Sequence, residues 1–263
     1  MRKKRGAIAS LLILIAVAFA ATGCYRGVRV GGLQTKSQTV ELGDTGAVDV
    51  EIQMGAGKLD VSGGASELLE ASFTYNVEEL NPQATFAGGR LEVKDSGVKV
   101  GIDFLADLDE FRNEWDLKMN EDAPMEMKIN LGAGPSKLAL GALALTSLNI
   151  EAGAGDVDLD LNGSRSLNRL DFNAGAGDVT IDLTGDWQHD LDARIGGGLG
   201  DIHLTLPRDV GVRLEIDPGI GAVDASGFTS DGNTYTNDAY GVSDVTLRIH
   251  IDGGVGNINV DLG

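Results

Sequence analysis

Apolar and polar residues alternate in short stretches along most of the chain, and some of these stretches recur. The stretch GAGDVDLDL at residues 153–161 returns as GAGDVTIDL at residues 175–183. In both copies an aliphatic residue occupies every second position after the glycines, and polar residues stand between. This period of two is typical of a β-strand with one buried face. The pattern therefore predicts short strands that each follow a Gly-x-Gly turn.

The Gly-x-Gly motif also sets the length of the repeating unit. It begins at Gly55, Gly132, Gly153, Gly175, Gly198, Gly219 and Gly254. From the second of these onward the spacings are 21, 22, 23, 21 and 35 residues, and a second alternating run precedes each pair of glycines. Each unit thus holds two strands, which stacking would pair with their counterparts about 4.8 Å away. We predict an all-β fold, a single parallel β-solenoid (β-helix) with coils of about 22 residues.

The regularity of the repeat divides this solenoid into two parts. Residues 132–263 carry the regular repeats, and residues 39–131 are expected to form less regular coils of the same solenoid. Residues 104–115 break the alternation, with large apolar side chains at spacings of 4, 3 and 4. These are Phe104, Leu108, Phe111 and Trp115. Such spacing predicts a short helix with one apolar face, packed over a side or an edge of the solenoid.

The N-terminus has the features of a bacterial lipoprotein signal peptide, residues 1–23. A basic leader, MRKKR, precedes an apolar core that is shorter than the roughly 20 residues that span a bilayer. The following ATGC resembles a lipobox, which implies cleavage before Cys24 and lipid on its sulfur. Residues 24–38 are then the lipidated cysteine and a tether. We expect an extracytoplasmic protein that is lipid-anchored to the bacterial cell membrane; a plain secretory signal is the alternative.

Charge limits the range of partners. The formal net charge is −19, and removal of the four basic leader residues changes it to −23. So acidic a surface repels nucleic acid and anionic lipid headgroups, so no nucleic-acid partner is expected. Cations, cationic polymers and basic protein surfaces remain as possible partners. Cys24 is the only cysteine, so the chain has no structural disulfide.

Three aspartates form the one candidate metal site. Asp156, Asp178 and Asp201 directly follow Gly-x-Gly motifs and should lie on successive coils, about 5 Å apart. Calcium could bind between them if further oxygen ligands completed its shell. The alternative is a solvated acidic edge, because strand alternation requires a polar residue there. A calcium-binding nonapeptide repeat is rejected, since it has its aspartate two places after the glycine. No other cofactor is expected.

A polar insertion offers the second candidate site. Residues 228–244 fill the one long interval between motifs and carry Tyr235 and Tyr240. Exposed tyrosines on a polar loop can supply compact area for contact with a partner. An ordinary surface insertion is the alternative.

No catalytic residue is predicted. The three histidines, His189, His203 and His250, lack the spacing of zinc ligands, and each Gly-x-Gly leads into a strand where a phosphate-binding loop would lead into a helix. Parallel β-helix enzymes that cut acidic polysaccharides have coils of similar length, so such an enzyme stays an alternative. It would need a basic cleft, however, and no convergent set of Lys and Arg is evident in the repeats. We expect a non-enzyme.

Several stretches resemble one known family. VDVEIQMGAGKLDVSGG, NEWDLKMNEDAPMEMKINLGAG and LTSLNIEAGAGDVDLDLNG, in this order, are similar to the bacterial toast rack family, and the match covers nearly all of the chain after about Thr39. That family is related to the C-terminal domains of cell-wall-active antibiotic response proteins and to candidate surface adhesins. The resemblance implies a β-helical, extracytoplasmic protein and supplies no catalytic residues.

Together these features predict a non-catalytic, membrane-anchored surface module for binding or scaffolding, similar to an adhesin. An envelope-stress sensing or regulatory subunit that docks on a membrane protein is the first alternative, and the polysaccharide-active enzyme is the second. The expected partners are the membrane, through Cys24, and a cell-envelope component or membrane protein. Because a strand runs up to Gly263, open strand edges also predict end-to-end self-association or a covering segment from elsewhere in the chain.

Overall fold

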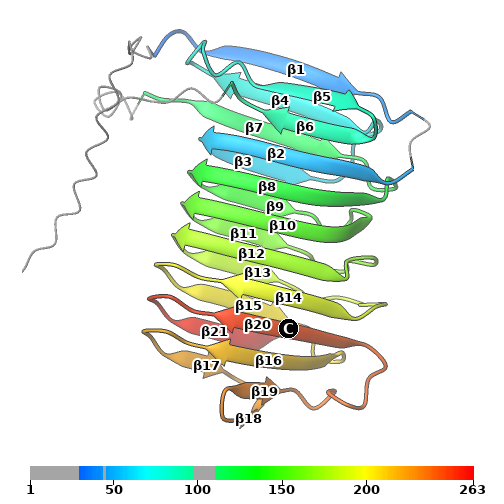
Figure 1. Ribbon diagram of the computed structural model, residues 1–263, viewed down its shortest axis with the longest axis vertical. Coiled ribbons are helices and arrows are strands. Elements are labelled where there is room, and N and C mark those ends of the chain that lie inside the picture. Colours follow the sequence, from blue (N-terminus) through cyan, green and yellow to red (C-terminus); the bar gives the residue numbers. More distant parts are fainter. Residues whose placement is uncertain (1–29, 44–45, 97–109) are drawn as a thin grey trace, which may run out of the picture.

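The computed structural model describes residues 30–43, 46–96 and 110–263, and these residues form two stacked β-sheets (Figure 1). All regular structure in these ranges is β-strand, so the all-β prediction is confirmed for them. Cys24, Phe104 and Leu108 lie outside the described residues.

Each sheet contains about half of the strands. The ten-stranded sheet, here sheet A, has the order β1 (Gln34–Val40), β4 (Leu69–Tyr75), β7 (Asn113–Met119), β3 (Lys58–Ser62), β9 (Ser136–Ala139), β11 (Val157–Asp160), β13 (Val179–Asp182), β15 (Ile202–Leu206), β21 (Ile258–Leu262) and β17 (Val223–Ala225). The eleven-stranded sheet, here sheet B, has the order β18 (Thr229–Asp231), β19 (Thr234–Thr236), β16 (Gly211–Asp217), β20 (Thr246–Asp252), β14 (Leu191–Gly196), β12 (Arg169–Ala176), β10 (Leu145–Ala154), β8 (Met125–Ala133), β2 (Val48–Ala56), β6 (Arg90–Lys94) and β5 (Gln83–Ala87).

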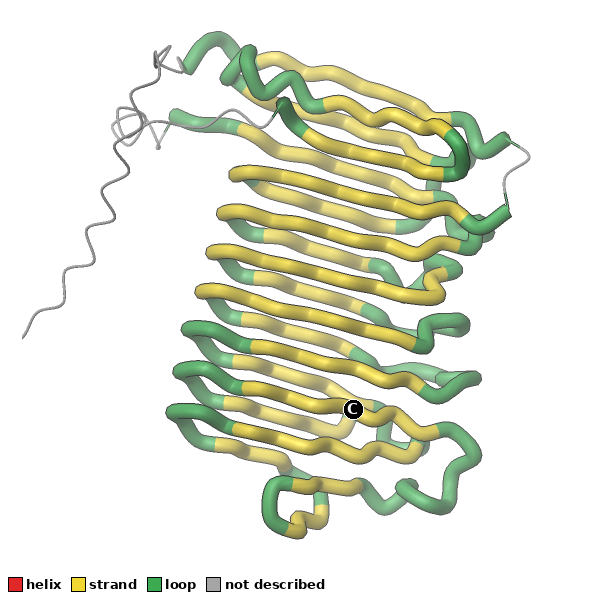
Figure 2. Tube along the Cα trace, viewed as in Figure 1, coloured by secondary structure: helices red, strands yellow, loops and turns green. Residues whose placement is uncertain are grey.

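The 22-residue repeat places corresponding strands of successive units side by side, where they pair in parallel and in register. From β8 to β15 successive strands alternate between the two sheets, and each pairs with its counterpart in the next unit (Figure 2). Ile150 of β10 lies beside Phe172 of β12, and Leu159 of β11 beside Ile181 of β13. All four side chains are buried, because the alternating apolar residues of both sheets point into one shared core.

The C-terminal strands depart from a simple sequential stack. After β16 and β17 the chain forms the β18–β19 hairpin and then returns, so that β20 lies between β14 and β16, and β21 between β15 and β17 (Figure 1). The strand before Gly263 is therefore internal to sheet A. The sequence predicted that this strand's open edge is covered either by another segment of the chain or by a second molecule. Strand β17 is such a covering segment, and end-to-end self-association stays a prediction.

The N-terminal strands are mixed where parallel coils were expected. The pairs β1–β4, β4–β7 and β5–β6 are antiparallel, and β7 lies between β4 and β3. Strand β1 includes Gln34–Gln38, so this part of the predicted tether belongs to the fold. A single parallel β-solenoid is thus too simple a description of both ends of the stack.

The predicted helix is wrong for the part of residues 104–115 that the structure describes. Asn113–Met119 form β7, with Trp115 only 1% exposed, and Phe111 packs beside Val77 and Leu80. Trp115, Leu117 and Met119 also follow the period of two of a strand. As a strand, this segment forms backbone hydrogen bonds with both β4 and β3. These sheet contacts favour the strand, although the spacing of the aromatic residues also fits a helix.

The Gly-x-Gly motifs form one corner of the stack, where the backbones of successive units approach closely. Gly155 has a φ of +134°, and a Cβ added there would overlap the carbonyl oxygen of Gly134 in the neighbouring unit. Glycine is required at this position because any side chain would meet backbone.

Candidate functional site

The predicted aspartate column lies on successive units, as expected, and forms a hydrogen-bond ladder. The backbone N–H of Asp178 donates to Oδ1 of Asp156 (3.0 Å), that of Asp201 to Oδ1 of Asp178 (2.9 Å), and that of Asn257 to Oδ1 of Asp201 (2.7 Å). Asn257 continues the ladder by accepting from Ala222 N–H at 3.2 Å. Each side chain thus satisfies the backbone of the next unit, which gives the aspartates a structural role.

The ladder does not depend on charge, because a neutral amide already serves in it at Asn257. Among residues 30–43, 46–96 and 110–263, no group of three or more His, Cys, Asp or Glu side chains is arranged to hold a metal ion. The calcium column therefore stays a prediction without a completed ligand set.

Substitutions at Asp178 separate the two roles. We expect Asp178→Ala to lower the free energy of unfolding by about 0.5–1.5 kcal/mol, because Asp201 N–H loses its acceptor. Asp178→Asn keeps that acceptor and should stay within about 0.5 kcal/mol of wild type. Urea unfolding with and without calcium measures both. Equal damage by the two variants, together with calcium stabilising only the wild type, would support the metal column instead.

The two tyrosines of the insertion have different surroundings. Tyr235 lies in β19, pairs with Leu214 of β16, and packs half-buried against the core. Tyr240 follows in a turn and is 42% exposed. Of the two, Tyr240 is the one whose ring is largely available for contact.

An exposed apolar ridge follows the glycine corner at the C-terminal end of the stack. It consists of the middle residues of three Gly-x-Gly motifs, Leu199, Val255 and Ile220, which are 46% to 73% exposed. Isolated bridges connect Leu199 to Val255 and Val255 to Ile220, so the three side chains lie on adjacent units. Clustered exposed apolar residues often mark interaction sites.

The structure also brings together four arginines that sequence analysis did not connect. This arginine cluster consists of Arg169 of β12, Arg194 of β14, Arg213 of β16 and Arg248 of β20. With His250 they line a shallow groove of about 350 Å³ on the outer face of sheet B. The expectation that no convergent set of basic residues exists is therefore wrong.

A signal for the cluster was present in the repeats. Arg169, Arg213 and Arg248 each stand six residues before the first glycine of a Gly-x-Gly motif, as does Asp192. Parallel pairing in register converts that shared position into one row across four strands, in the order Arg169, Asp192, Arg248, Arg213. The next row reads Asp171, Arg194, His250, Glu215.

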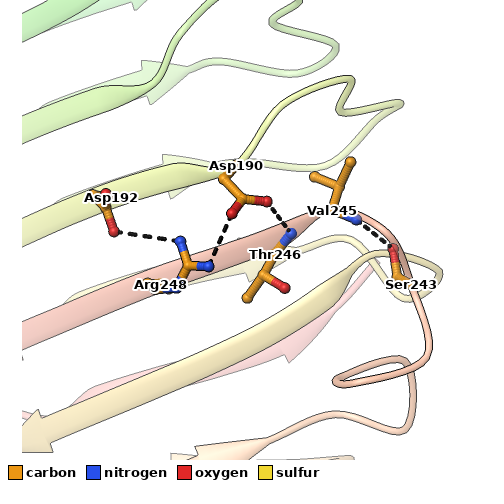
Figure 3. Close-up of polar contacts among 6 residues, drawn as sticks. All are labelled: Asp190, Asp192, Ser243, Val245, Thr246 and Arg248. Atoms are coloured by element: carbon orange, nitrogen blue, oxygen red, sulfur yellow. Dashed lines mark hydrogen bonds and ion pairs between the residues drawn. The ribbon is translucent and has the colours of Figure 1, made fainter.

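Arg248 is the most firmly held member of the cluster (Figure 3). Its Nη2 donates to Oδ2 of Asp190 at 2.9 Å, and its Nη1 lies 3.7 Å from Oδ1 of Asp192. Oδ1 of Asp190 accepts from Thr246 N–H at 2.9 Å, and Ser243 Oγ accepts from Val245 N–H just before the strand begins. These contacts fix the start of β20 and the orientation of the Arg248 guanidinium group.

The same contacts shift two pKa values. The Thr246 N–H and then Arg248 lower the pKa of the Asp190 carboxyl, while Asp190 raises the pKa of Arg248. The pKa of the Asp190 carboxyl is lower in the folded chain than its ordinary value of 3.8. The contact therefore stabilises the fold at a pH above 3.8, and this stabilisation is lost as the pH falls through the lowered pKa. Both side chains are about half exposed, so solvent weakens the effect.

The other three arginines are held loosely. Arg194 lies 3.5 Å from Asp171, and Arg213 lies 3.7 Å from Glu215 on its own strand. The guanidinium group of Arg169 makes no hydrogen bond or ion pair with the part of the chain that the structure describes. The groove thus presents several guanidinium donors that are free to meet a ligand.

Comparison with known proteins gives matches to one family and to solved structures. The sequence profile of the N-terminal domain of toast_rack (DUF2154) matches residues 29–168 and 165–205. A crystal structure of a candidate cell adhesion protein from Clostridium sporogenes ATCC 15579 is 30% identical, with a TM-score of 0.68, over 88% of this chain and 100% of that chain. No curated protein matches.

More distant structures also match. A candidate adhesin from Bacteroides fragilis NCTC 9343 is 14% identical over 87% of this chain and 97% of its own, with a TM-score of 0.41. One from Parabacteroides merdae ATCC 43184 is 15% identical over 88% and 96%, with a TM-score of 0.33. Within the described residues, no helix is long and apolar enough to cross a membrane.

Proposed function

Because the chain belongs to the toast rack family, we propose that it is a non-catalytic β-solenoid lipoprotein that acts as an adhesin-like binding module outside the cytoplasm. The observation that carries this proposal is its 30% identity, over 88% of the chain, with the candidate cell adhesion protein of C. sporogenes. In this proposal residues 39–131 are the irregular coils and residues 132–263 carry the Gly-x-Gly repeats, whose last units are reordered by β20 and β21.

The two outer faces support a binding function because they differ in chemistry. On sheet A the strands β11, β13, β15, β21 and β17 present Asp158, Asp160, Asp182, Asp261 and Asp224 without a lysine or arginine. On sheet B the neighbouring strands present the arginine cluster. Side chains on paired strands are held at fixed spacings, so a partner meets a preformed surface.

Lipid on Cys24 would hold these faces close to the membrane. Strand β1 begins at Gln34, so residues 25–33 are left to connect the cysteine to the fold. A fully extended chain of that length reaches about 30 Å. We therefore propose a surface-proximal module with a short tether.

Substitution of Cys24 tests the anchor. We expect Cys24→Ala to move the protein from the membrane fraction to the soluble extracytoplasmic fraction, because no sulfur remains to carry lipid. Thermal unfolding of the released protein should match that of wild-type protein freed of its lipid, since Cys24 precedes all the described strands. Gly23→Ala is the matched control, because it keeps a small residue before the cysteine.

Attachment assays test adhesion itself. Cells that display the wild-type protein should attach to envelope or host surfaces better than cells that secrete Cys24→Ala, at equal expression. Added soluble Cys24→Ala protein should compete and reduce attachment by the wild-type cells. Equal attachment of the two strains would contradict the proposal.

A second candidate function is docking on a membrane protein, and the apolar ridge favours it. In this case a specific membrane protein would co-purify from detergent-solubilised envelopes. Leu199→Ser with Ile220→Ser should abolish that co-purification without lowering the melting temperature, because both side chains are exposed. Co-purification that persists in the double variant would argue against the ridge.

A further inference from the structure

We propose that the arginine cluster, with His250, binds an acidic polysaccharide through the anionic groups that the polymer carries. This inference rests on the proposed binding function and names the chemical class of ligand. Carboxylates and phosphodiesters share the relevant chemistry, since guanidinium groups bind both through paired N–H donors.

The distribution of charge makes the cluster unusual. After Lys137 the chain contains twenty acidic residues and six basic ones, all of them arginine. Four of these six arginines line the single groove on β12, β14, β20 and β16. In a half of the chain that is otherwise acidic, this concentration of cations is local to one face of sheet B.

The insertion of β20 creates a like-charge contact there. Between β12 and β14 the rows alternate in sign, with Arg169 beside Asp192 and Asp171 beside Arg194. Strand β20 then places Arg248 directly beside Arg213. Like charges opposite one another on adjacent strands are destabilising. A bound anion between them removes that cost, which favours a ligand at this position.

The guanidinium groups also retain unused donors. Arginine has five N–H donors. Arg248 uses only some of them on Asp190 and Asp192, and Arg213 lies 3.7 Å from Glu215. The guanidinium group of Arg169 has no hydrogen-bond or ion-pair partner among the described residues. An anion at the groove can therefore be bound without breaking the contacts that fix β20.

The shape and lining of the groove indicate a sugar polymer. The groove is shallow and crosses four strands, roughly 14 Å at the spacing of a sheet, which suits an extended chain better than a small enclosed molecule. Asp192 and Glu215 stand among the arginines. Carboxylates repel a uniform polyanion but accept hydrogen bonds from hydroxyl groups, so the lining matches a ligand with both anions and hydroxyls. No Phe, Tyr or Trp side chain is among the described residues that line the groove, so it lacks the large rings on which bases stack.

Binding to defined polymers tests the inference. The full mature protein is titrated with polygalacturonate, a polysaccharide that carries carboxylates, and with poly(N-acetylglucosamine 1-phosphate), a polysaccharide that carries phosphodiesters. We expect one of them to bind in a salt-sensitive manner, and Arg169→Gln with Arg213→Gln to weaken that binding about tenfold or more. Asp192→Asn should strengthen it, because an acidic neighbour is removed. Arg165→Gln is the matched control, an exposed arginine that lies outside the cluster.

The outcomes are distinct. Loss of binding in the double variant supports the proposal, and the polymer that binds identifies the anionic group. Failure of both polymers to bind the wild type, or equal weakening by Arg165→Gln, overturns it. If wild-type cells still attach better than Cys24→Ala cells while neither polymer binds, the proposed function stands and the ligand class is wrong. Unfolding curves of the double variant check that a loss of binding does not come from a loss of folding.

Discussion

Replacing Gly155 with alanine is expected to lower the melting temperature by roughly 10 °C. The new Cβ would overlap the carbonyl oxygen of Gly134 in the neighbouring unit, and the backbone, with a φ of +134°, cannot shift without disturbing that pairing. Strained backbone costs about 1–3 kcal/mol, and forced overlap in a packed region costs about the same again. Substitution at one corner should therefore destabilise the stacked units on both sides.

Thermal unfolding followed by circular dichroism measures this effect. Gly163→Ala is the matched control, since Gly163 also has a positive φ, +71°, but no atom lies within 4 Å of its added Cβ. Gly163→Ala should lower the free energy of unfolding only by the cost of placing alanine in the left-handed conformation, about 1–2 kcal/mol. Equal melting temperatures for the two variants would show that the close approach at the glycine corner is not what requires glycine.

Trp115→Ala is expected to lower the free energy of unfolding by about 3–5 kcal/mol. The ring is buried in the core and meets Phe73 edge to face, with centroids 5.4 Å apart. Its Nε1–H donates to Oδ1 of Asn113 at 2.8 Å, and Asn113 in turn donates to the carbonyl oxygen of Ala56. Alanine removes the packed volume and leaves a buried amide oxygen without its donor.

Urea unfolding and the near-ultraviolet circular dichroism signal measure this loss. Trp115→Phe is the control, because it keeps an aromatic ring beside Phe73 and removes only the hydrogen bond and part of the volume; about half of the effect should remain. A change below about 1 kcal/mol in the alanine variant would be inconsistent with a Trp115 that is central to the N-terminal core.

Local pattern was sufficient to predict the strands of the regular repeats. The alternation of Val157, Leu159 and Leu161 identified both the strand and its buried face, and the glycine spacing identified the register. The order of the last units was not predictable in the same way. Strands β16 and β20 carry the same apolar alternation, so either could pair with β14, and the choice depends on where the chain between them leads.

Two further features could not be predicted from the sequence, because they too depend on contacts between segments far apart in the chain. Trp115 satisfied both a helical and a strand period, and only its neighbours in the sheet decide between them. The aspartates were located correctly as a column, but their acceptor role depends on the offset between one side chain and the next backbone N–H, which is a property of the stack. The arginine cluster required both the shared position before the glycines and the order of units.

The position of β20 and β21 also determines when the fold can be completed. Strands β8 to β15 can pair unit by unit as the polypeptide emerges, but β16 and β17 have no parallel neighbour until the residues up to Leu262 are available. Leu191 must wait for Leu247, 56 positions later. Pairing between segments so far apart in sequence is slow compared with pairing of successive units. We therefore expect this end of the stack to be the last to complete its folding.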